Sequence, residues 1–228
     1  MYMYASKEMS VFDIIGPNMI GPSSSHTAGA LRIAKLARNM VKKQIKQVKF
    51  ILYGSFAQTY RGHGTDRALV AGMLGFDTED YRIKESFAHA REAGLYYVFE
   101  TNSSKPDTHP NTVDIIITDE DNEETTVTGI SVGGGRAVIK KINGVDIDLS
   151  GDYHTLVIRH KDLPGVVAGV TNILSQFEVN IAFMKLYREN KGTIAYSIIE
   201  TDQPIEEEMT DKIEDLHSVF HAFLIEKL

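Results

Sequence analysis

Residues 161–167, Lys-Asp-Leu-Pro-Gly-Val-Val, form the turn that decides the fold of the C-terminal part of the chain. Asp162 can cap a helix, Pro164 suits a first helical turn, and Gly165 permits a close approach of the backbone. Around this turn, strand and helix patterns follow one another over residues 153–159, 164–177, 180–188, 193–201, 205–216 and 219–225, of which the second and fifth are helical. This βαββαβ order predicts a ferredoxin-like sandwich.

Upstream of a short polar seam at residues 150–152, the order of the elements is different. Apolar residues at helical spacing follow the serine run 23–25, and an alternating strand starts near Val48. A glycine-bearing polar connection over 54–65, two helices and five further strands come next, with turns indicated by the acidic run 119–124 and by Asn143-Gly144. We therefore expect an α+β protein with a mixed α/β domain over 1–150 and the smaller sandwich over 151–228.

The composition excludes several classes of protein. The 228 residues contain no Cys, which excludes disulfides and any thiolate metal site held by this chain alone. Acidic side chains outnumber basic ones by 31 to 24, and the net charge of −7 argues against nucleic-acid binding. No apolar run approaches the ~20 residues of a membrane span, and residues 1–8 do not have the pattern of a signal peptide. We expect a cytoplasmic protein, and no spacing typical of metal ligands appears in it.

A first candidate site is the run 21–29, Gly-Pro-Ser-Ser-Ser-His-Thr-Ala-Gly, at the start of the first helix. Free backbone N–H groups and the positive end of the helix dipole favour a carboxylate or a phosphate there. One serine suffices for an N-cap, so the additional hydroxyls beside an imidazole indicate binding, although an elaborate cap with a surface histidine is the alternative. The candidate residues in this run are Ser23, Ser24, Ser25, His26 and Thr27.

Two further runs carry polar side chains of the same kinds. Residues 61–67, Arg-Gly-His-Gly-Thr-Asp-Arg, place His63 between glycines before the next helix, which is typical either of a plain turn or of a ligand contact. If the two helix N-termini point at one crevice, His26 and His63 can face one substrate as acid, base or orienting group. Residues 107–112, Asp-Thr-His-Pro-Asn-Thr, favour a turn and can add polar groups to that crevice.

In the small domain, the loop that contains Asp162 and Gly165 has two interpretations. It is either a well-made turn between a strand and a helix, or part of a small-ligand site shared between two such domains. Asn180 starts the second strand of this domain and is expected beside the loop. Asp162, Gly165 and Asn180 are therefore the candidate effector-binding residues.

The run from Ser10 to Gly29, with Ser-Val-Phe-Asp-Ile-Ile-Gly-Pro and Met-Ile-Gly-Pro-Ser-Ser-Ser-His-Thr-Ala-Gly, closely resembles the beta chain of iron–sulfur L-serine dehydratase. Gly-His-Gly-Thr-Asp at 62–66 and His-Pro-Asn at 109–111 recur in that family in the same order. The C-terminal part resembles an ACT domain, a module that commonly binds amino acids. The resemblance to the serine dehydratase beta chain and the ACT domain together spans nearly the whole chain. The large domain is also similar to the allosteric substrate-binding domain of some phosphoglycerate dehydrogenases.

This resemblance implies that L-serine is converted to pyruvate and ammonia without pyridoxal phosphate, with a [4Fe-4S] cluster acting as Lewis acid on the substrate hydroxyl. In that family the cysteines of the cluster belong to an alpha chain, which agrees with a chain that has none. His63 and His26 would be catalytic, with His63 the leading acid or base. The implied substrate-binding residues are Ser23, Ser24, Ser25, Thr27, Gly64, Thr65, Asp66 and Asn111.

The implied partners are the alpha chain, L-serine and a second copy of the chain bound through the ACT domain, with no nucleic acid and no membrane. The similarity to phosphoglycerate dehydrogenases leaves an alternative from another class, a regulatory amino-acid sensor that performs no catalysis. A hydrolase that uses His26 and His63 is more remote, because the sequence offers no nucleophile for it.

Overall fold

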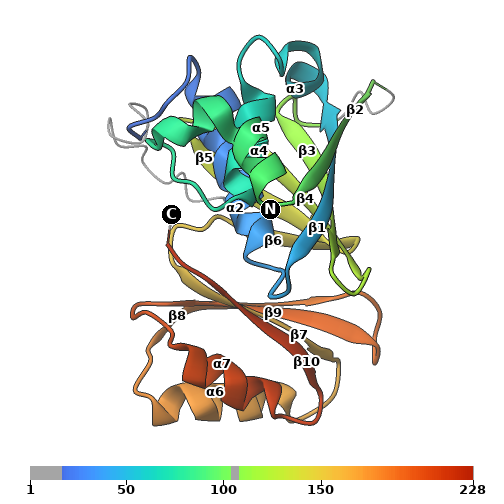
Figure 1. Ribbon diagram of the computed structural model, residues 1–228. Coiled ribbons are helices and arrows are strands. Elements are labelled where there is room, and N and C mark those ends of the chain that lie inside the picture. The colour runs from blue at the N-terminus through green and yellow to red at the C-terminus, as the bar shows by residue number, and fades with distance from the viewer. Residues whose placement is uncertain (1–16, 104–107, 228) are drawn as a thin grey trace, which may run out of the picture.

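A computed structural model describes residues 17–103 and 108–227 and shows two β-sheets, each covered by helices on one face (Figure 1). The sheet of the large domain has six strands in the order β2-β1-β3-β4-β5-β6, and that of the small domain has four in the order β10-β7-β9-β8. Residues 10–16 of the serine-rich motif and Asp107 of the third candidate run lie outside the described residues. The expected α+β class is confirmed.

The large sheet is mixed, because one of its pairs is parallel and the others are antiparallel. Strands β1 and β2 run parallel, so the chain between them crosses over through helices. All other neighbours in this sheet pair antiparallel. The strands are β1 (Ile45–Tyr53), β2 (Tyr96–Asn102), β3 (Thr112–Asp119), β4 (Glu124–Gly133), β5 (Arg136–Ile142) and β6 (Val145–Leu149). The helices are η1 (Ser24–Ala28), α2 (Gly29–Arg38), α3 (Gly54–Thr59), α4 (Thr65–Met73), η2 (Tyr81–Glu85) and α5 (Ser86–Glu92).

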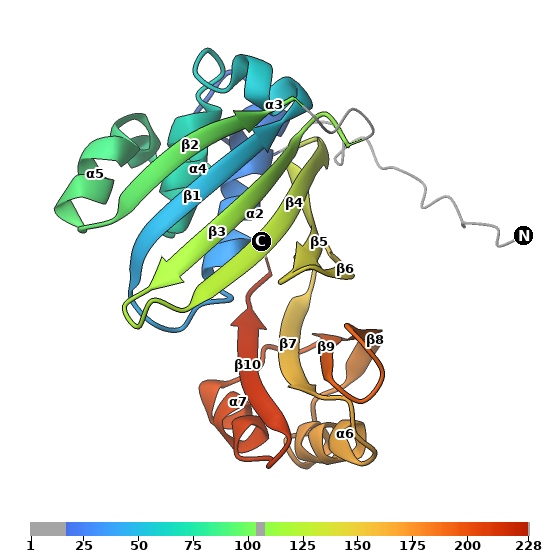
Figure 2. The ribbon, with the colours of Figure 1, turned by 90° about the vertical axis from the view of Figure 1, so that its right-hand side faces the viewer.

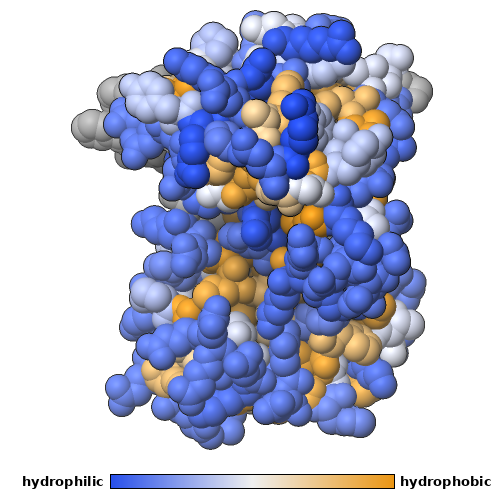
Figure 3. All heavy atoms as spheres, viewed as in Figure 1, coloured by the Kyte–Doolittle hydropathy of each residue, from blue (hydrophilic) through white to orange (hydrophobic). Residues whose placement is uncertain are grey.

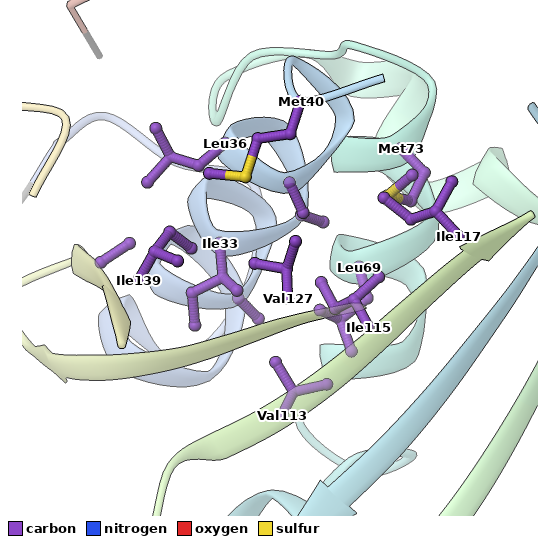
Figure 4. Close-up of a cluster of buried hydrophobic side chains, with 14 of the residues drawn as sticks. Ile33, Leu36, Met40, Leu69, Met73, Val113, Ile115, Ile117, Val127 and Ile139 are labelled. Carbon is purple, nitrogen blue, oxygen red and sulfur yellow. The ribbon is translucent and has the colours of Figure 1, made fainter. Parts of the chain in front are cut away.

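Alternation along the strands explains why the helices cover only one face of this sheet (Figure 2). Val48, Phe50 and Leu52 of β1 are fully buried on the helix face, whereas the residues between them are less buried. Helices α2 and α4 pack on this face and on each other. Their Ile33 and Leu69 meet the sheet residues in one cluster (Figure 4).

Two features of the large domain differ from the pattern expected from the sequence. The connection over 54–65 contains the short helix α3, and the first helix starts with a π-type turn, η1, rather than with regular α geometry. In both cases a loop distant in sequence contacts the segment. Phe56 of α3 donates its N–H to the carbonyl of Pro110, and Thr27 of η1 donates its hydroxyl to the carbonyl of His63. Elsewhere the predicted strands and helices are confirmed, with ends shifted by a few residues.

The small domain has the predicted βαββαβ order. Its elements are β7 (His154–Lys161), α6 (Val166–Gln176), β8 (Ile181–Arg188), β9 (Ile194–Thr201), α7 (Glu207–Glu214) and β10 (Val219–Ile225). Helices α6 and α7 cover one face, where Leu156, Ile158 and Ile199 enter a core with residues of both helices. This is the ferredoxin-like sandwich.

The other face of the small sheet packs against the large domain. Val157, Tyr196, Ile198 and Ile225 belong to the same buried cluster as the core of the large domain. Hydrophobic residues are visible between the two halves of the molecule, among mostly hydrophilic neighbours (Figure 3). The junction is therefore a shared apolar core and not a loose linker.

Within residues 17–103 and 108–227, no helix has the length and apolar character needed to cross a membrane.

Candidate functional site

The serine-rich run forms the N-terminus of the helix made by η1 and α2. Ser23 is the N-cap residue: it has an extended backbone, and its Oγ accepts a hydrogen bond of 3.2 Å from the backbone N–H of His26. The carbonyl of Ser23 accepts a further 2.8 Å bond from the N–H of Thr27. Ser24 and Ser25 are the first two residues after the cap and are half-buried. Their hydroxyls and backbone N–H groups therefore belong to the first turn of the helix.

The imidazole of His26 is held by hydroxyls on both ring nitrogens. Its Nδ1 is hydrogen-bonded to Ser25 Oγ at 3.1 Å, and its Nε2 to Ser55 Oγ at 2.9 Å. The ring packs edge-on against Phe56, with centroids 5.3 Å apart. Burial of the ring, and secondarily the nearby His63, lower the pKa of His26. At neutral pH this imidazole is therefore uncharged.

His63 lies directly beside His26. The two ring centroids are 4.8 Å apart and the ring planes are perpendicular. The hydroxyl of Thr27 donates to the backbone carbonyl of His63 at 3.3 Å, which ties the loop before α4 to the serine-rich turn. His63 itself is exposed. The expected convergence of the two imidazoles is thus present, while their roles stay predictions.

The loop that contains His63 leads into helix α4 through a residue with a positive backbone φ. Gly64 is the N-cap residue of α4 and has φ +69°, a conformation that costs glycine nothing. The N-cap residue offers no side-chain cap, and Asp66 Oδ1 accepts a 2.8 Å bond from the N–H of Arg67 in the first turn. Asp66 is half-buried, and this burial raises the pKa of its carboxyl.

Thr65 differs from the other predicted contacts, because its side chain is fully buried at 0% exposure. Its Oγ1 has no hydrogen-bond partner within the described residues, and its N–H donates to the carbonyl of Tyr60. The hydroxyl of Thr65 is directed into the protein by the packing at the start of α4. A substrate contact by this side chain stays a prediction, since its hydroxyl is buried and has no acceptor among the described residues.

The third run lies beside the first two. The carbonyl of Pro110 accepts a 3.2 Å bond from the N–H of Phe56, and a Cβ on Gly54 would be 2.7 Å from Pro110 Cα. Asn111 is joined to Ser131 by a backbone bond of 3.0 Å and by its side-chain amide at 3.4 Å. The amide of Asn111 thus already has a backbone acceptor, and the run acts as the expected turn that braces the site.

Ser55 is the functional candidate that sequence reasoning missed. It belongs to the connection that was expected to be irregular, and it holds the second nitrogen of His26. The available signal was Gly54, which follows a strand and has φ +50°. Because Gly54 packs against the Pro110 backbone, only glycine allows α3 to start at this place.

The donor set of this chain does not fit an iron–sulfur cluster. The sequence has no Cys, and within residues 17–103 and 108–227 no group of three or more His, Asp or Glu side chains is arranged to hold a metal ion. Thiolates are the usual ligands of such clusters. The described residues therefore offer no ligand set for such a cluster.

The candidate effector residues do not lie together in one chain. Asp162 is ion-paired with Arg188 at 3.1 Å and accepts a bond from the N–H of Gly192, at one end of the sheet. Asn180 is hydrogen-bonded to Asp202 at 2.5 Å, at the other end, where β8 begins. The expectation that Asn180 lies beside the loop is wrong, because β8 runs antiparallel to β9 and places its start far from that loop. Gly165 is the N-cap residue of α6 at φ +90°, with open space around it.

Known proteins are similar in sequence to this chain over most of its length. Residues 10–96 match the family described as serine dehydratase beta chain, and residues 154–218 match the ACT domain. The chain is 44% identical over 216 residues to the probable L-serine dehydratase beta chain of Bacillus subtilis, covering 95% of this chain and 97% of that protein. It is 43% identical to the L-serine dehydratase beta chain of Peptoniphilus asaccharolyticus, covering 90% and 93%. It is also 28% identical to D-3-phosphoglycerate dehydrogenase of Bacillus subtilis, covering 86% of this chain and 37% of that protein.

The fold and the paired-imidazole site define a two-domain α/β protein whose C-terminal module is an ACT domain. The sequence identity of 43–44% to two L-serine dehydratase beta chains, over nearly their full lengths, narrows the class to one family. The chain belongs to the L-serine dehydratase beta-chain family.

Proposed function

We propose that this chain binds L-serine and supplies the proton-transferring imidazole of an L-serine dehydratase, which forms pyruvate and ammonia. The observation that carries the proposal is the 4.8 Å contact between the rings of His26 and His63, at the start of a hydroxyl-rich helix. Two relatives that match nearly the whole chain are named as beta chains of this enzyme, which supports the proposal.

The serine-rich turn is suited to the carboxylate of the substrate. The first N–H groups of a helix have no acceptors inside the helix, and its positive dipole end favours an anion. Ser24 and Ser25 carry their hydroxyls at this end, next to His26. The substrate carboxylate is proposed to accept from these groups, with Ser23 and Thr27 keeping the turn in shape.

The two histidines have different surroundings, which suggests different roles. Both ring nitrogens of His26 have hydroxyl partners, so this residue is proposed to orient the site as a neutral imidazole. His63 is exposed and its ring contacts His26, so it is able to exchange a proton with substrate and solvent. His63 is therefore the proposed base that removes the weakly acidic α-hydrogen of serine.

Loss of hydroxide from the β-carbon needs help that this chain does not provide. A metal that polarises the hydroxyl supplies such help, and a [4Fe-4S] cluster held by the cysteines of an alpha chain is the proposed source, with no pyridoxal phosphate. Removal of the α-proton and departure of the hydroxyl as water give aminoacrylate. That compound tautomerises and hydrolyses to pyruvate and ammonia in water.

The test is reconstitution with the alpha chain. Anaerobic mixing of the two chains should give pyruvate formation that depends on L-serine, and His63→Ala should remove most of the rate, by about 100-fold or more. His217→Ala is the matched control, since this histidine is exposed and lies in the small domain. Turnover of His63→Ala equal to that of the His217→Ala control would defeat the assignment of the base.

The ACT domain is proposed to pair with that of a second copy. Phe183 and Leu186 are exposed on β8, which is an edge strand of the small sheet. Because Asn180 and the loop of Asp162 lie apart in one chain, an effector site made from both requires two chains. Sedimentation of the chain as a monomer at all concentrations would speak against this pairing.

The similarity to D-3-phosphoglycerate dehydrogenase over 86% of the chain favours a second candidate function. A scaffold shared with a protein of another name is consistent with a sensor that binds an amino acid and performs no chemistry. In that case calorimetry should show that L-serine binds to this chain alone. The alpha chain would then turn over serine equally well with and without it.

A further inference from the structure

A cavity of about 460 Å³ lies at the junction of the two domains, away from the paired histidines. The large domain contributes the end of α2 and the hairpin turns beside β4, and the small domain contributes the face of its sheet that points away from α6 and α7. Among its lining residues are Met40, Asn143, Arg159, Tyr196, His221 and Phe223.

Arg159 is the unusual group in this cavity. Its Nε is buried and has no hydrogen-bond partner within the described residues. The guanidinium lies 5.1 Å from the ring centre of Phe220 and reaches the hydroxyl of Tyr196. The buried Nε of Arg159 is thus a donor without an acceptor among residues 17–103 and 108–227. A donor that is withdrawn from water without an acceptor is costly.

The other cations of the cavity already have partners. Lys42 is paired with Glu214 at 2.8 Å, and this contact bridges the two domains. Lys43 is paired with Asp121 at 2.7 Å and lies 3.9 Å from Glu123. Lys43 is shared by Asp119, Asp121 and Glu123, so the cavity wall at the hairpin between β3 and β4 is acidic. On the small-domain wall, Arg159 keeps a buried Nε donor that has no acceptor among the described residues.

Neutral polar groups surround Arg159 in positions that suit an anion. Asn143 donates from Nδ2 to the Tyr196 hydroxyl at 3.1 Å, which leaves the hydroxyl hydrogen available to a ligand. Arg159 pairs across the sheet with Tyr196 on β9 and with His221 on β10. Burial lowers the pKa of His221, with Glu214 acting in the opposite direction. An uncharged His221 can donate or accept one hydrogen bond.

We propose that this junction cavity is a second ligand site, in which Arg159 binds the carboxylate or phosphate group of a small molecule. Arginine presents a planar fork of donors that matches either group. The walls come from both domains, so an occupant contacts both at once. Binding therefore couples the two domains, because the occupant stabilises the arrangement in which both walls contact it.

The absence of tryptophan from the chain allows a site-specific test. Phe223→Trp places a single indole in the cavity wall. Addition of sodium succinate or sodium phosphate at millimolar concentration should change its fluorescence, against sodium chloride of equal ionic strength. In Phe223→Trp with Arg159→Met, the apparent affinity should fall about tenfold or more. A response to one salt only identifies the group that is bound, and an equal response of both proteins overturns the proposal.

Thermal unfolding of the unlabelled protein gives a second measurement that does not depend on the indole. Succinate or phosphate should raise the Tm of the wild type and of Arg91→Met, a control that removes an exposed arginine from the large domain. Arg159→Met should lose most of this shift, and its Tm without anion should equal or exceed that of the wild type because a buried donor without an acceptor is removed. An unchanged shift in Arg159→Met overturns the proposal.

Discussion

At the scale of the residue, His26 shows how the site uses burial to set a charge. The imidazole is only 9% exposed, and its nitrogens are hydrogen-bonded to Ser25 and Ser55. One hydroxyl can accept from the protonated nitrogen while the other donates to the unprotonated nitrogen, which satisfies a neutral ring. The same two oxygens could accept from both nitrogens of a protonated ring, so burial, and secondarily the nearby His63, favour the uncharged form.

This burial predicts a pH dependence of stability. The folded-state pKa of His26 is lowered from 6.5, mainly by desolvation, so between these two values the unfolded chain binds more protons than the folded one. The contribution of His26 to the free energy of unfolding should thus be constant above pH 6.5. It should fall as the pH drops from 6.5 towards the folded-state pKa, because the unfolded chain then gains the proton first. Urea unfolding of the wild type and His26→Gln across this range should show a smaller decline in the variant. Identical declines would mean that His26 titrates normally.

At the scale of the element, the contact between α2 and α4 depends on one glycine. A Cβ on Gly72 would be 2.3 Å from the carbonyl oxygen of Leu31 and 2.7 Å from Ala34 Cβ. Helix backbones at this distance cannot separate without disturbing the sheet residues beneath them (Figure 4). Gly169 in α6 is a useful contrast, since its nearest neighbour is the flexible end of Leu216 at 3.2 Å.

The two glycines should respond to alanine in opposite ways. Gly72→Ala is expected to lower the free energy of unfolding by about 1–3 kcal/mol, because the rigid backbone of α2 must move. Gly169→Ala is expected to leave it unchanged or to raise it by up to ~1 kcal/mol, through helix propensity. Urea unfolding measures both. A destabilisation of Gly169→Ala as large as that of Gly72→Ala would show that helix packing is not the cause.

At the scale of the whole molecule, the small sheet has a core on each of its faces. Ile198 belongs to the cluster of the large domain, and the next residue, Ile199, belongs to the cluster under α6 and α7. Successive side chains of a strand point to opposite faces, so two neighbouring isoleucines report on two different interfaces.

Truncation of these two residues should separate the interfaces. Ile198→Ala and Ile199→Ala should each cost about 2–5 kcal/mol. Native-state hydrogen exchange should show that Ile198→Ala also speeds exchange in β5 and β6, whereas the effect of Ile199→Ala stays within the small domain. Unaffected β5 and β6 in Ile198→Ala would mean that the junction does not couple the domains.

Much of the fold follows from local patterns. The alternation at Val48, Phe50 and Leu52 predicted a half-covered strand, and Asn143-Gly144 predicted a two-residue hairpin turn; both are present. The unbroken apolar run Leu156-Val157-Ile158 is typical of a strand buried on both faces. This run indicates that the small sheet is covered on both sides, which the order of strands and helices alone does not show.

The candidate site was predictable in its residue types but not in its full geometry. Clustered hydroxyls and glycines indicated that His26 and His63 would meet, and they do. Ser55 was missed because Gly54 signals only a turn after the strand, and the contact of Ser55 with His26 depends on the approach of Gly54 to Pro110, more than 50 residues away in sequence. Asn180 was misplaced because β8 runs antiparallel to β9, which puts the start of β8 at the end of the sheet opposite the Asp162 loop.

The place of β10 has a consequence for folding during synthesis. This strand emerges last of the ten, pairs with β7, and carries Ile225 into the core of the large domain. Until it leaves the ribosome, β7 has an open edge and Val157 lacks its neighbour Phe223. Before residues 219–225 are synthesised, the two halves of the nascent chain therefore lack the contact that Ile225 makes between them. Slow translation before residue 219 would prolong exposure to aggregation, and rapid completion would shorten it.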